Sequence, residues 1–314
     1  MRRFHQAAVS LIVAVAASGC APAVQDADPA ARTAAEAPAA NTYHFMRNAT
    51  ARLDYAGQTF LLDPMLSAKG ALPSFAGIAP NPTLELPVPV ADIIADVDGV
   101  IVSHLHPDHF DPAAAQALPK AIPILTPSNQ AAIDPANAAE TTQSFAAQLA
   151  AYGFTNVATI GDRGTSFRGV TVTQEFGAHG TGLAGQLLGG VNGIVLKAPG
   201  QPTIYWTGDT ILDAEGRIEA ILARYKPDII IAHTGGAMVK ALSPDPILMN
   251  EAQALALFRA ADRYNPKVRI VAVHMNALDH CFTTRESLAK AVAGLPEGLR
   301  RRIDIPEEGQ RISF

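Results

Sequence analysis

Short apolar runs bounded by turn residues recur along the chain from residue 50 onward, and most have the length of a β-strand. Ala56-Gly57 separates two such runs, at 50–55 and 58–63, which predicts a β-hairpin. Val100, Ile101 and Val102 predict a short buried strand. Further strands are expected at 122–125, 156–160, 170–176, 194–197, 203–207, 229–232 and 268–273. We expect the four strands between residues 156 and 207 to be antiparallel, since Gly-rich turns separate them.

Helical patterns alternate with strands in much of the chain. Asp111 followed by Pro112 is typical of an N-cap and the first position of a helix that continues to Leu118. Other helices are expected at 143–152, 214–225, 249–264 and from Thr284 onward. A series of strands followed by alternating helices and strands predicts an α/β fold with two sheets and helices outside them.

Residues 64–90 interrupt this pattern with six prolines, which predicts a long loop and not a helix. A loop of that length in a compact domain is usually functional or disordered. Phe75, Leu84 and Leu86 would help it to lie over a site as a lid or wall.

The amino terminus has the pattern of an export signal. Arg2 and Arg3 precede a short apolar run at 7–17, which is too short for a mature membrane-spanning helix and suits a secretory signal. The following residues, 17–20, are Ala-Ser-Gly-Cys and resemble the bacterial lipoprotein box. This resemblance implies a signal peptide at 1–20, lipid on Cys20, and a protein anchored in the bacterial cell envelope, on the periplasmic or outer-membrane face. An ordinary cleaved signal, or none, is the alternative.

Residues 21–41 contain almost no large apolar side chain and are expected to form a flexible linker, which leaves 42–314 as one layered α/β domain. The chain is 48% hydrophobic, which suits a large buried core, and its net charge of −5 without a basic cluster gives no support for nucleic-acid binding. There are two cysteines, Cys20 and Cys281. If Cys20 carries lipid, Cys281 has no partner, and a disulfide framework is excluded.

Four candidate metal ligands follow the strand at 100–102, namely His104, His106, Asp108 and His109. Open α/β sheets place ligands at the carboxyl ends of their strands. Imidazoles and carboxylates are the ligands of hydrolytic zinc or manganese sites. The alternative is a polar loop that happens to be rich in histidine.

Three more candidates each stand at or just past the end of an expected strand: His179, Asp209 and His274. Glycines flank the first two, which allows close backbone approach. A lone histidine in such a place is more often a satisfied core or loop residue. Several at equivalent strand ends, together with the loop at 104–109, predict one metal centre.

The motif His104-x-His106-x-Asp108-His109, followed in order by His179, Asp209 and His274, resembles the metallo-β-lactamase superfamily over nearly all of residues 45–314. The resemblance implies a four-layer αβ/βα sandwich with two divalent metal ions between the sheets, zinc foremost and manganese or iron as alternatives. It assigns one ion to His104, His106 and His179, and the other to Asp108, His109 and His274. Asp209 would bridge the two ions.

Residues 62–67, 234–236 and 274–280 resemble the ascorbate-6-phosphate-lactonase-like branch of that superfamily more closely. His233 departs from the pattern, because an apolar residue or Asn is expected there for that branch. Asp63 is expected to hydrogen-bond a ligand histidine, and His233 to support the site from behind the ligands.

Such a centre would make a water nucleophilic by lowering its pKa from 15.7 to about neutral, and would polarise the bond under attack. Asp108 could also orient the nucleophile or accept its proton. By resemblance, the members of the family that hydrolyse β-lactams do not usually bridge their ions with Asp. Asp209 therefore favours lactonase, esterase or phosphodiesterase activity over antibiotic hydrolysis. Among these we expect cleavage of a lactone or ester in a small or lipid-like substrate.

His280 is a second candidate catalytic residue, as a proton donor or substrate anchor, although it could equally be a supporting residue. Two other functions stay open from the sequence. One is a phosphodiesterase or phospholipase-D-like hydrolase, and the other is a lipoprotein that binds metal without catalysis. The oligomeric state cannot be predicted.

Overall fold

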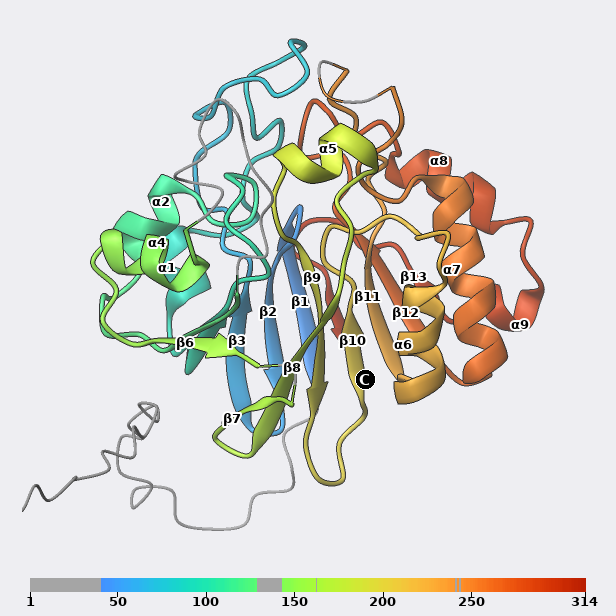
Figure 1. The fold of residues 1–314 in the computed structure, drawn as a ribbon, viewed down its shortest axis with the longest axis horizontal. Coiled ribbons are helices and arrows are strands. Elements are labelled where there is room, and N and C mark those ends of the chain that lie inside the picture. The colour runs from blue at the N-terminus through green and yellow to red at the C-terminus, as the bar shows by residue number, and fades with distance from the viewer. Residues whose placement is uncertain (1–40, 129–142, 162, 241, 243) are drawn as a thin grey trace, which may run out of the picture.

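Two seven-stranded β-sheets face one another, with helices on their outer faces (Figure 1). The structure is a computed structural model that describes residues 41–128, 143–161, 163–240, 242 and 244–314. The four layers confirm the predicted αβ/βα sandwich. The expected signal peptide, Cys20 and nearly all of the expected linker lie outside the described residues.

The first sheet contains the predicted hairpin. Its strands, in spatial order, are β14 (Arg311–Ser313), β1 (Thr42–Arg47), β2 (Thr50–Tyr55), β3 (Gln58–Leu62), β4 (Gly99–Ile101), β5 (Ile124–Pro127) and β6 (Val157–Ile160). β2 and β3 pair antiparallel around Ala56-Gly57, as predicted. The expectation that 156–160 belongs to an antiparallel run is wrong, because β6 pairs parallel with β5. The connection through helix α4 (Phe145–Ala151) is long enough to return the chain in the same direction.

The second sheet combines antiparallel and parallel strands. In spatial order they are β13 (Ile303–Asp304), β12 (Arg269–Val273), β11 (Ile229–His233), β10 (Ile204–Trp206), β9 (Asn192–Lys197), β8 (Val170–Phe176) and β7 (Thr165–Phe167). β8, β9 and β10 pair antiparallel, as expected, and β10 to β13 pair parallel. β7, which the sequence pattern did not predict, pairs antiparallel with β8. The carboxyl ends of β10, β11 and β12 therefore lie side by side.

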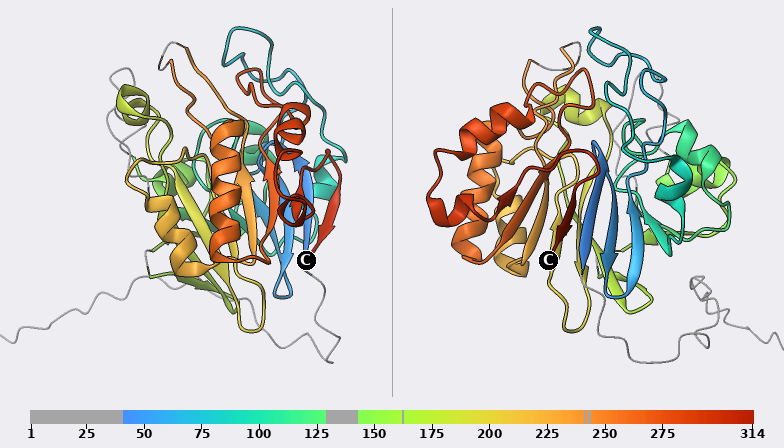
Figure 2. Two further views of the ribbon diagram at one scale, coloured as in Figure 1. Left: turned by 90° about the vertical axis from the view of Figure 1, so that its right-hand side faces the viewer. Right: turned by 180° about the vertical axis from the view of Figure 1, so that it is seen from behind.

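Helices cover the outer face of each sheet (Figures 1 and 2). The first sheet packs against α1 (Val90–Ile94), α2 (Pro112–Ala117) and α4. The second packs against α6 (Arg217–Tyr225), α7 (Glu251–Tyr264), α8 (Arg285–Val292) and α9 (Glu297–Arg300). α5 (Gly182–Leu187) lies beyond the upper end of the sheets in Figure 1. Within the described ranges, no helix has the length and apolarity needed to cross a membrane.

Local sequence explains several of these boundaries. α2 begins as predicted, with the Asp111 carboxylate accepting the backbone N–H of Ala114 and with Pro112 at the first helical position. Residues 64–89 form no helix, in agreement with their prolines. β1, which the sequence pattern did not predict, contains His44.

The main core lies between the two sheets. Side chains from the facing strands, among them Leu53, Phe60, Val172, Trp206 and Val271, form one buried apolar cluster. This cluster holds the sheets together and leaves one end of the sandwich to the loops that follow β4, β8, β10 and β12.

Candidate metal centre

The loop after β4 brings polar side chains into the interior at one end of the sandwich. His104, Asp108 and His109 are each at most 5% exposed, and His106 is half-buried. The second sheet supplies His179 after β8, Asp209 after β10 and His274 after β12, all of them buried. The structure therefore brings together all seven residues that the sequence predicts as metal ligands.

Three histidines form the first cluster. Nε2 of His104 lies 3.0 Å from Nδ1 of His106, and the ring of His179 lies 5.1 Å from that of His106. One ligand atom from each of the three residues lies within 4.8 Å of the others. Because these nitrogens converge on one point, the cluster has the geometry of a three-histidine metal site.

The second cluster contains Asp108, His109 and His274. Nε2 of His109 lies 3.1 Å from Nε2 of His274. Oδ2 of Asp108 lies 3.4 Å from Nε2 of His274 and 3.6 Å from Nε2 of His109.

Asp209 lies between the two clusters. Its Oδ2 is 3.2 Å from Nε2 of His109, 3.3 Å from Nε2 of His274 and 3.9 Å from Nε2 of His179. One carboxylate oxygen thus faces ligand nitrogens of both clusters. This is the position that a bridging carboxylate would occupy.

The carboxylate of Asp63 orients two of the histidines, as the sequence predicts for one of them. Oδ2 of Asp63 accepts hydrogen bonds from Nδ1 of His109 (2.6 Å) and from the Ser103 hydroxyl (2.6 Å), and Oδ1 accepts the backbone N–H of Ser103. The Ser103 oxygen is in turn 3.0 Å from Nδ1 of His104. These bonds place a hydrogen on Nδ1 of both rings and direct their Nε2 atoms at the centre.

Backbone carbonyls orient two more histidines. Nδ1 of His179 donates to the carbonyl of Ile247 (2.7 Å), and Nε2 of His106 donates to that of Leu188 (2.8 Å). These bonds fix the ring tautomers and turn Nε2 of His179 and Nδ1 of His106 toward the cluster.

This donor set fits divalent cations. Neutral ring nitrogens that approach to 3.0 Å face each other with lone pairs, an arrangement that a cation between them would stabilise. The charges agree with this fit. Burial raises the pKa of Asp108 and Asp209, but His109 and His274 outweigh it and hold both carboxyls well below their usual range.

The same field acts on the histidines. Burial alone would lower the pKa of His109, but Asp209, Asp108 and Asp63 raise it to about 10. Burial and the neighbouring His106 lower the pKa of His179 to about 4. Without a metal, protons on His109 and His274 neutralise the carboxylates, and a metal would have to displace them.

Comparison with known proteins identifies the family. The family model described as the beta-lactamase superfamily domain matches residues 58–275. The chain belongs to the metallo-β-lactamase superfamily. It is similar to UPF0173 protein YddR of Bacillus subtilis (strain 168), with 32% identity over 275 residues that cover 86% of this chain and 98% of the relative. Three proteins called UPF0173 metal-dependent hydrolases also match, at 26–27% identity.

Two solved structures extend this result. An isothiocyanate hydrolase from Delia radicum gut bacteria is 34% identical, with a TM-score of 0.73 and coverage of 87% of this chain and 99% of that one. A protein described as a possible metal-dependent hydrolase from Veillonella parvula DSM 2008 is 29% identical, with a TM-score of 0.75 and coverage of 88% and 100%. The protein is thus a metal-dependent hydrolase of the metallo-β-lactamase superfamily, with a candidate metal-binding cluster of histidines and aspartates.

His233 lies behind the metallo-β-lactamase centre and not among its ligands, although it is close enough to be one. Its Nδ1 is 2.7 Å from Oδ1 of Asp209, and its Nε2 accepts the indole N–H of Trp206 at 2.8 Å. Since both ring nitrogens are engaged, His233 has no lone pair free for a metal.

Asn48 is a site residue that the sequence analysis missed. It lies in the turn between β1 and β2. Its side-chain N–H donates to the backbone carbonyl of Asp108, and its backbone carbonyl accepts the backbone N–H of His274. Asn48 therefore joins two loops that carry ligands. Its φ of 57° lies in the left-handed region, which Asn tolerates better than most residues, but an Asn in a turn has no signal that is specific for this role.

The loop at residues 74–81, here called the wall loop, encloses the carboxylate of Asp279. Oδ1 and Oδ2 of Asp279 accept hydrogen bonds from four backbone N–H groups, one hydroxyl and one amide: Phe75, Ala76, Ile78, Ala79, Ser74 and Asn81. These donors outweigh the effect of burial and hold the pKa of Asp279 well below its usual range. The wall loop is thus fixed by one carboxylate. Phe75 lies against His280, in agreement with its predicted place in a wall, whereas Leu86 packs into the outer apolar cluster of the first sheet.

His280 lies under the wall loop. It is 6% exposed, its ring packs edge-on against Phe75 with 5.2 Å between ring centroids, and its Nδ1 has no hydrogen-bond partner in the described part of the chain. Burial lowers its pKa, against the opposing charge of Asp108. The imidazole is therefore neutral at pH 7, and its role in catalysis stays a prediction.

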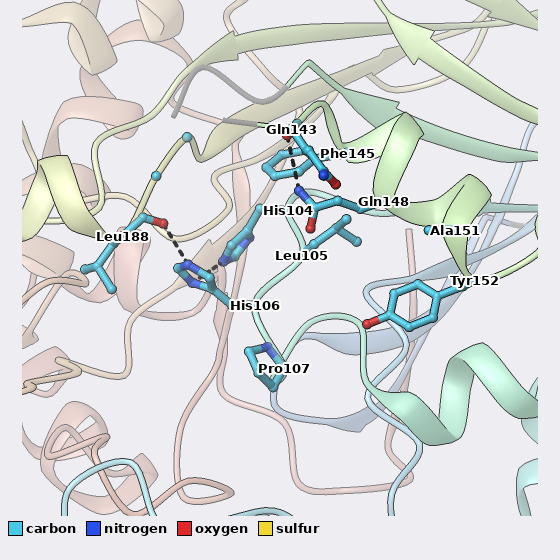
Figure 3. A pocket seen from close by; sticks show the side chains of 12 residues that line it. His104, Leu105, His106, Pro107, Gln143, Phe145, Gln148, Ala151, Tyr152 and Leu188 are labelled. Atoms are coloured by element: carbon cyan, nitrogen blue, oxygen red, sulfur yellow. Dashed lines mark hydrogen bonds between the residues drawn. The ribbon is translucent and has the colours of Figure 1, made fainter. Parts of the chain in front are cut away.

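A cavity of about 510 Å³ opens beside His104 and His106 (Figure 3). Among the described residues its lining is apolar or uncharged apart from these two imidazoles, and includes Leu105, Phe145, Leu188, Gln148 and Tyr152. This lining suits a neutral organic molecule next to the first histidine cluster.

Proposed function

We propose that this hydrolase uses two divalent metal ions, zinc foremost, to cleave a lactone or ester bond in a small neutral substrate. The observation that carries the proposal is the position of Asp209 Oδ2 between two histidine clusters. Two histidines of the first cluster, His104 and His106, line a cavity to which the described residues contribute no carboxylate, lysine or arginine. The resemblance of residues 62–67, 234–236 and 274–280 to the lactonase-like branch supports the choice of bond.

The residues of the centre have separate tasks. His104, His106 and His179 would hold one ion, Asp108, His109 and His274 the other, and Asp209 would bridge them. Ions held there would lower the pKa of a bound water to about 7 and polarise the scissile carbonyl.

Asp108 and His280 would move the protons. Asp108, which His109 and His274 keep ionised, would orient the attacking water and accept its proton. The water oxygen bonds to the acyl carbon and the bond from that carbon to the ester oxygen breaks. The proton accepted by Asp108 would reach the leaving oxygen through the neutral His280 ring, which gives up one N–H proton as its other nitrogen receives one.

An isothiocyanate is the second candidate substrate, because the isothiocyanate hydrolase is 34% identical over nearly the whole domain. Its central carbon is also a neutral electrophile, and addition of water would yield an amine and carbonyl sulfide. A phosphodiester is anionic and suits this cavity less well, because the described residues contribute no lysine or arginine to its lining.

The test is hydrolysis by the full chain, loaded in turn with zinc, manganese and iron(II), of a γ-lactone, an aryl ester, an isothiocyanate and a bis-aryl phosphate. We expect the lactone or the ester to give the highest kcat/KM, and the Asp209→Ala variant to lose this activity and part of its metal. Turnover of the isothiocyanate alone would identify the protein as an isothiocyanate hydrolase, the second candidate. Cleavage of the phosphate alone, or no turnover by fully loaded protein, would refute the proposal.

A further inference from the structure

We infer that His233 is a positioning residue that holds Asp209 so that only Oδ2 faces the metal centre, and that Trp206 in turn holds His233. The inference rests on the proposed metal centre and adds two residues that bind neither metal nor substrate. The geometry of the second sheet carries it.

Sheet order places these residues together. β11 lies between β10 and β12 and runs parallel to both, with Trp206 opposite Ile231 and His233 opposite Val273. His233 ends β11, so it stands between the strand that precedes Asp209 and the strand that precedes His274. Trp206, Asp209 and His233 are each at most 2% exposed, so water does not compete for their hydrogen bonds.

The hydrogen bonds determine the tautomer of His233. An indole nitrogen can only donate, so Nε2 of His233, at 2.8 Å from Nε1 of Trp206, must be the acceptor. The neutral ring then carries its hydrogen on Nδ1, which donates to Oδ1 of Asp209 at 2.7 Å. Trp206, His233 and Asp209 thus form a hydrogen-bonded series in which each donor has one acceptor.

These hydrogen bonds determine which oxygen of Asp209 can bind metal. Oδ1 is occupied by His233, while Oδ2 lies within 3.9 Å of ligand nitrogens of three histidines, His109, His274 and His179. Without the N–H of His233, Oδ1 would be a buried anionic oxygen without that donor, and the carboxylate could rotate. Loss of such a supporting bond typically lowers metal affinity by about 10–100-fold.

Trp206 provides a spectroscopic signal from this hydrogen-bonded series. Trp206 is the single tryptophan of the protein, so intrinsic indole fluorescence comes from the residue at the end of this hydrogen-bonded series. Metal binding by Asp209 changes the charge two hydrogen bonds away from the indole. We expect addition of zinc to metal-free protein to change the fluorescence in step with binding.

The experiment compares two replacements of His233 by titration of metal-free full-length protein with zinc, followed by calorimetry and Trp206 fluorescence. His233→Asn places an amide N–H near the position of Nδ1 and keeps a donor for Asp209. His233→Leu is similar in volume and has no donor. We expect about a 10–100-fold loss of zinc affinity in His233→Leu, substantial recovery in His233→Asn, and a weaker fluorescence response in His233→Leu.

Controls separate positioning from folding. His44→Leu replaces another buried histidine, in β1 of the first sheet, and should keep wild-type zinc affinity. Trp206→Phe keeps His233 but removes the donor to Nε2, and we expect it to lose zinc affinity, by less than His233→Leu. If His233→Leu does not fold, the zinc affinities of Trp206→Phe and His233→Asn test the inference instead.

Three results would overturn the inference: wild-type affinity in His233→Leu, equal losses in His233→Leu and His233→Asn, or wild-type affinity in Trp206→Phe. A wild-type protein that binds no zinc, manganese or iron would instead refute the proposed function itself.

Discussion

At the scale of single residues, Asp63 makes the bonds that orient two histidines of the first sheet. An amide at this position would present an N–H₂ group to donors that now meet a carboxylate: His109, the Ser103 hydroxyl and the Ser103 backbone. We expect Asp63→Asn to lower zinc affinity by about 10–100-fold, measured by competition with a chelator of known affinity. Asp96→Asn, at an exposed position whose φ of 54° suits Asn, should have no effect. An unchanged affinity in Asp63→Asn would show that the histidines do not need this carboxylate.

His280 allows a test that separates chemistry from metal binding. If its imidazole donates the proton to the leaving group, His280→Gln should lower kcat by about 10²–10⁴-fold while metal content stays at the wild-type value. Substrates with a good leaving group, such as an aryl ester, should be affected least, because they need the proton least. Elemental mass spectrometry and steady-state kinetics on the same preparation provide both measurements. A uniform loss across all leaving groups would instead indicate a role in binding.

Much of the site could be predicted from single residues of the sequence, for an identifiable reason. His179, Asp209 and His274 each follow a strand, and the carboxyl ends of strands meet in an α/β fold, so their position in the chain predicts their position in space. The bond from His233 to Asp209 could not be predicted, since it depends on β11 lying between β10 and β12. Sheet order is a property of the whole fold and has no local signal.

At the scale of elements, the wall loop differs from a mobile lid because one carboxylate fixes it. The backbone N–H groups of Phe75, Ala76, Ile78 and Ala79 donate to the carboxylate of Asp279. The guanidinium of Arg47 donates to the carbonyls of Met65 and Ser67 before the loop and of Leu84 after it. Phe75 is thereby held against His280. The wall of the site is therefore formed before substrate binds.

Replacing Asp279 should loosen this wall. Asp279→Asn removes the charge and turns an N–H₂ group toward several donors, so we expect a loss of about 1–3 kcal/mol in the free energy of unfolding at pH 7. We also expect a higher KM with unchanged metal content. Urea denaturation and kinetics measure the two effects, with the exposed Asp92→Asn as the control. A wild-type KM in a destabilised Asp279→Asn variant would show that the wall loop does not contact substrate.

The pH dependence of that difference follows from the lowered pKa of Asp279. The unfolded carboxyl titrates near 3.9, while the folded one titrates lower, so the folded state favours the ionised form. The stabilisation by Asp279 is fully present above about pH 5 and is lost as pH falls through the folded pKa. The difference in free energy of unfolding between wild type and Asp279→Asn, measured on metal-free protein, should become smaller below about pH 4. A difference that stays constant down to pH 3 would contradict this account.

Several elements show the limits of prediction from sequence. The hairpin of β2 and β3 is predictable because Ala56-Gly57 gives it a local signal. The direction of β6 is set by the connection before it, and β1 escaped recognition because it contains His44 and Arg47, two polar residues that are nonetheless buried. Pattern rules assume that polar residues face solvent, and that assumption fails for Arg47, whose buried guanidinium donates to three backbone carbonyls.

At the scale of the whole molecule, the metal centre joins the two halves of the sandwich. Four predicted ligands follow β4 of the first sheet, and three follow β8, β10 and β12 of the second. The ions would thus cross-link sheets that otherwise contact one another through apolar side chains and loops.

Removing the ions should therefore destabilise the entire domain and not the loops alone. Ligand binding to the folded state adds RT ln(1 + [L]/Kd), about 4 kcal/mol for a free metal concentration 1,000 times Kd. We expect a chelator to lower the melting temperature of the full chain, measured by scanning calorimetry, and added zinc to restore it. Asp209→Ala, which lacks the bridge between the clusters, should show a smaller difference between its loaded and metal-free forms. An equal difference in both proteins would mean that the ions stabilise each half separately and that Asp209 does not connect them.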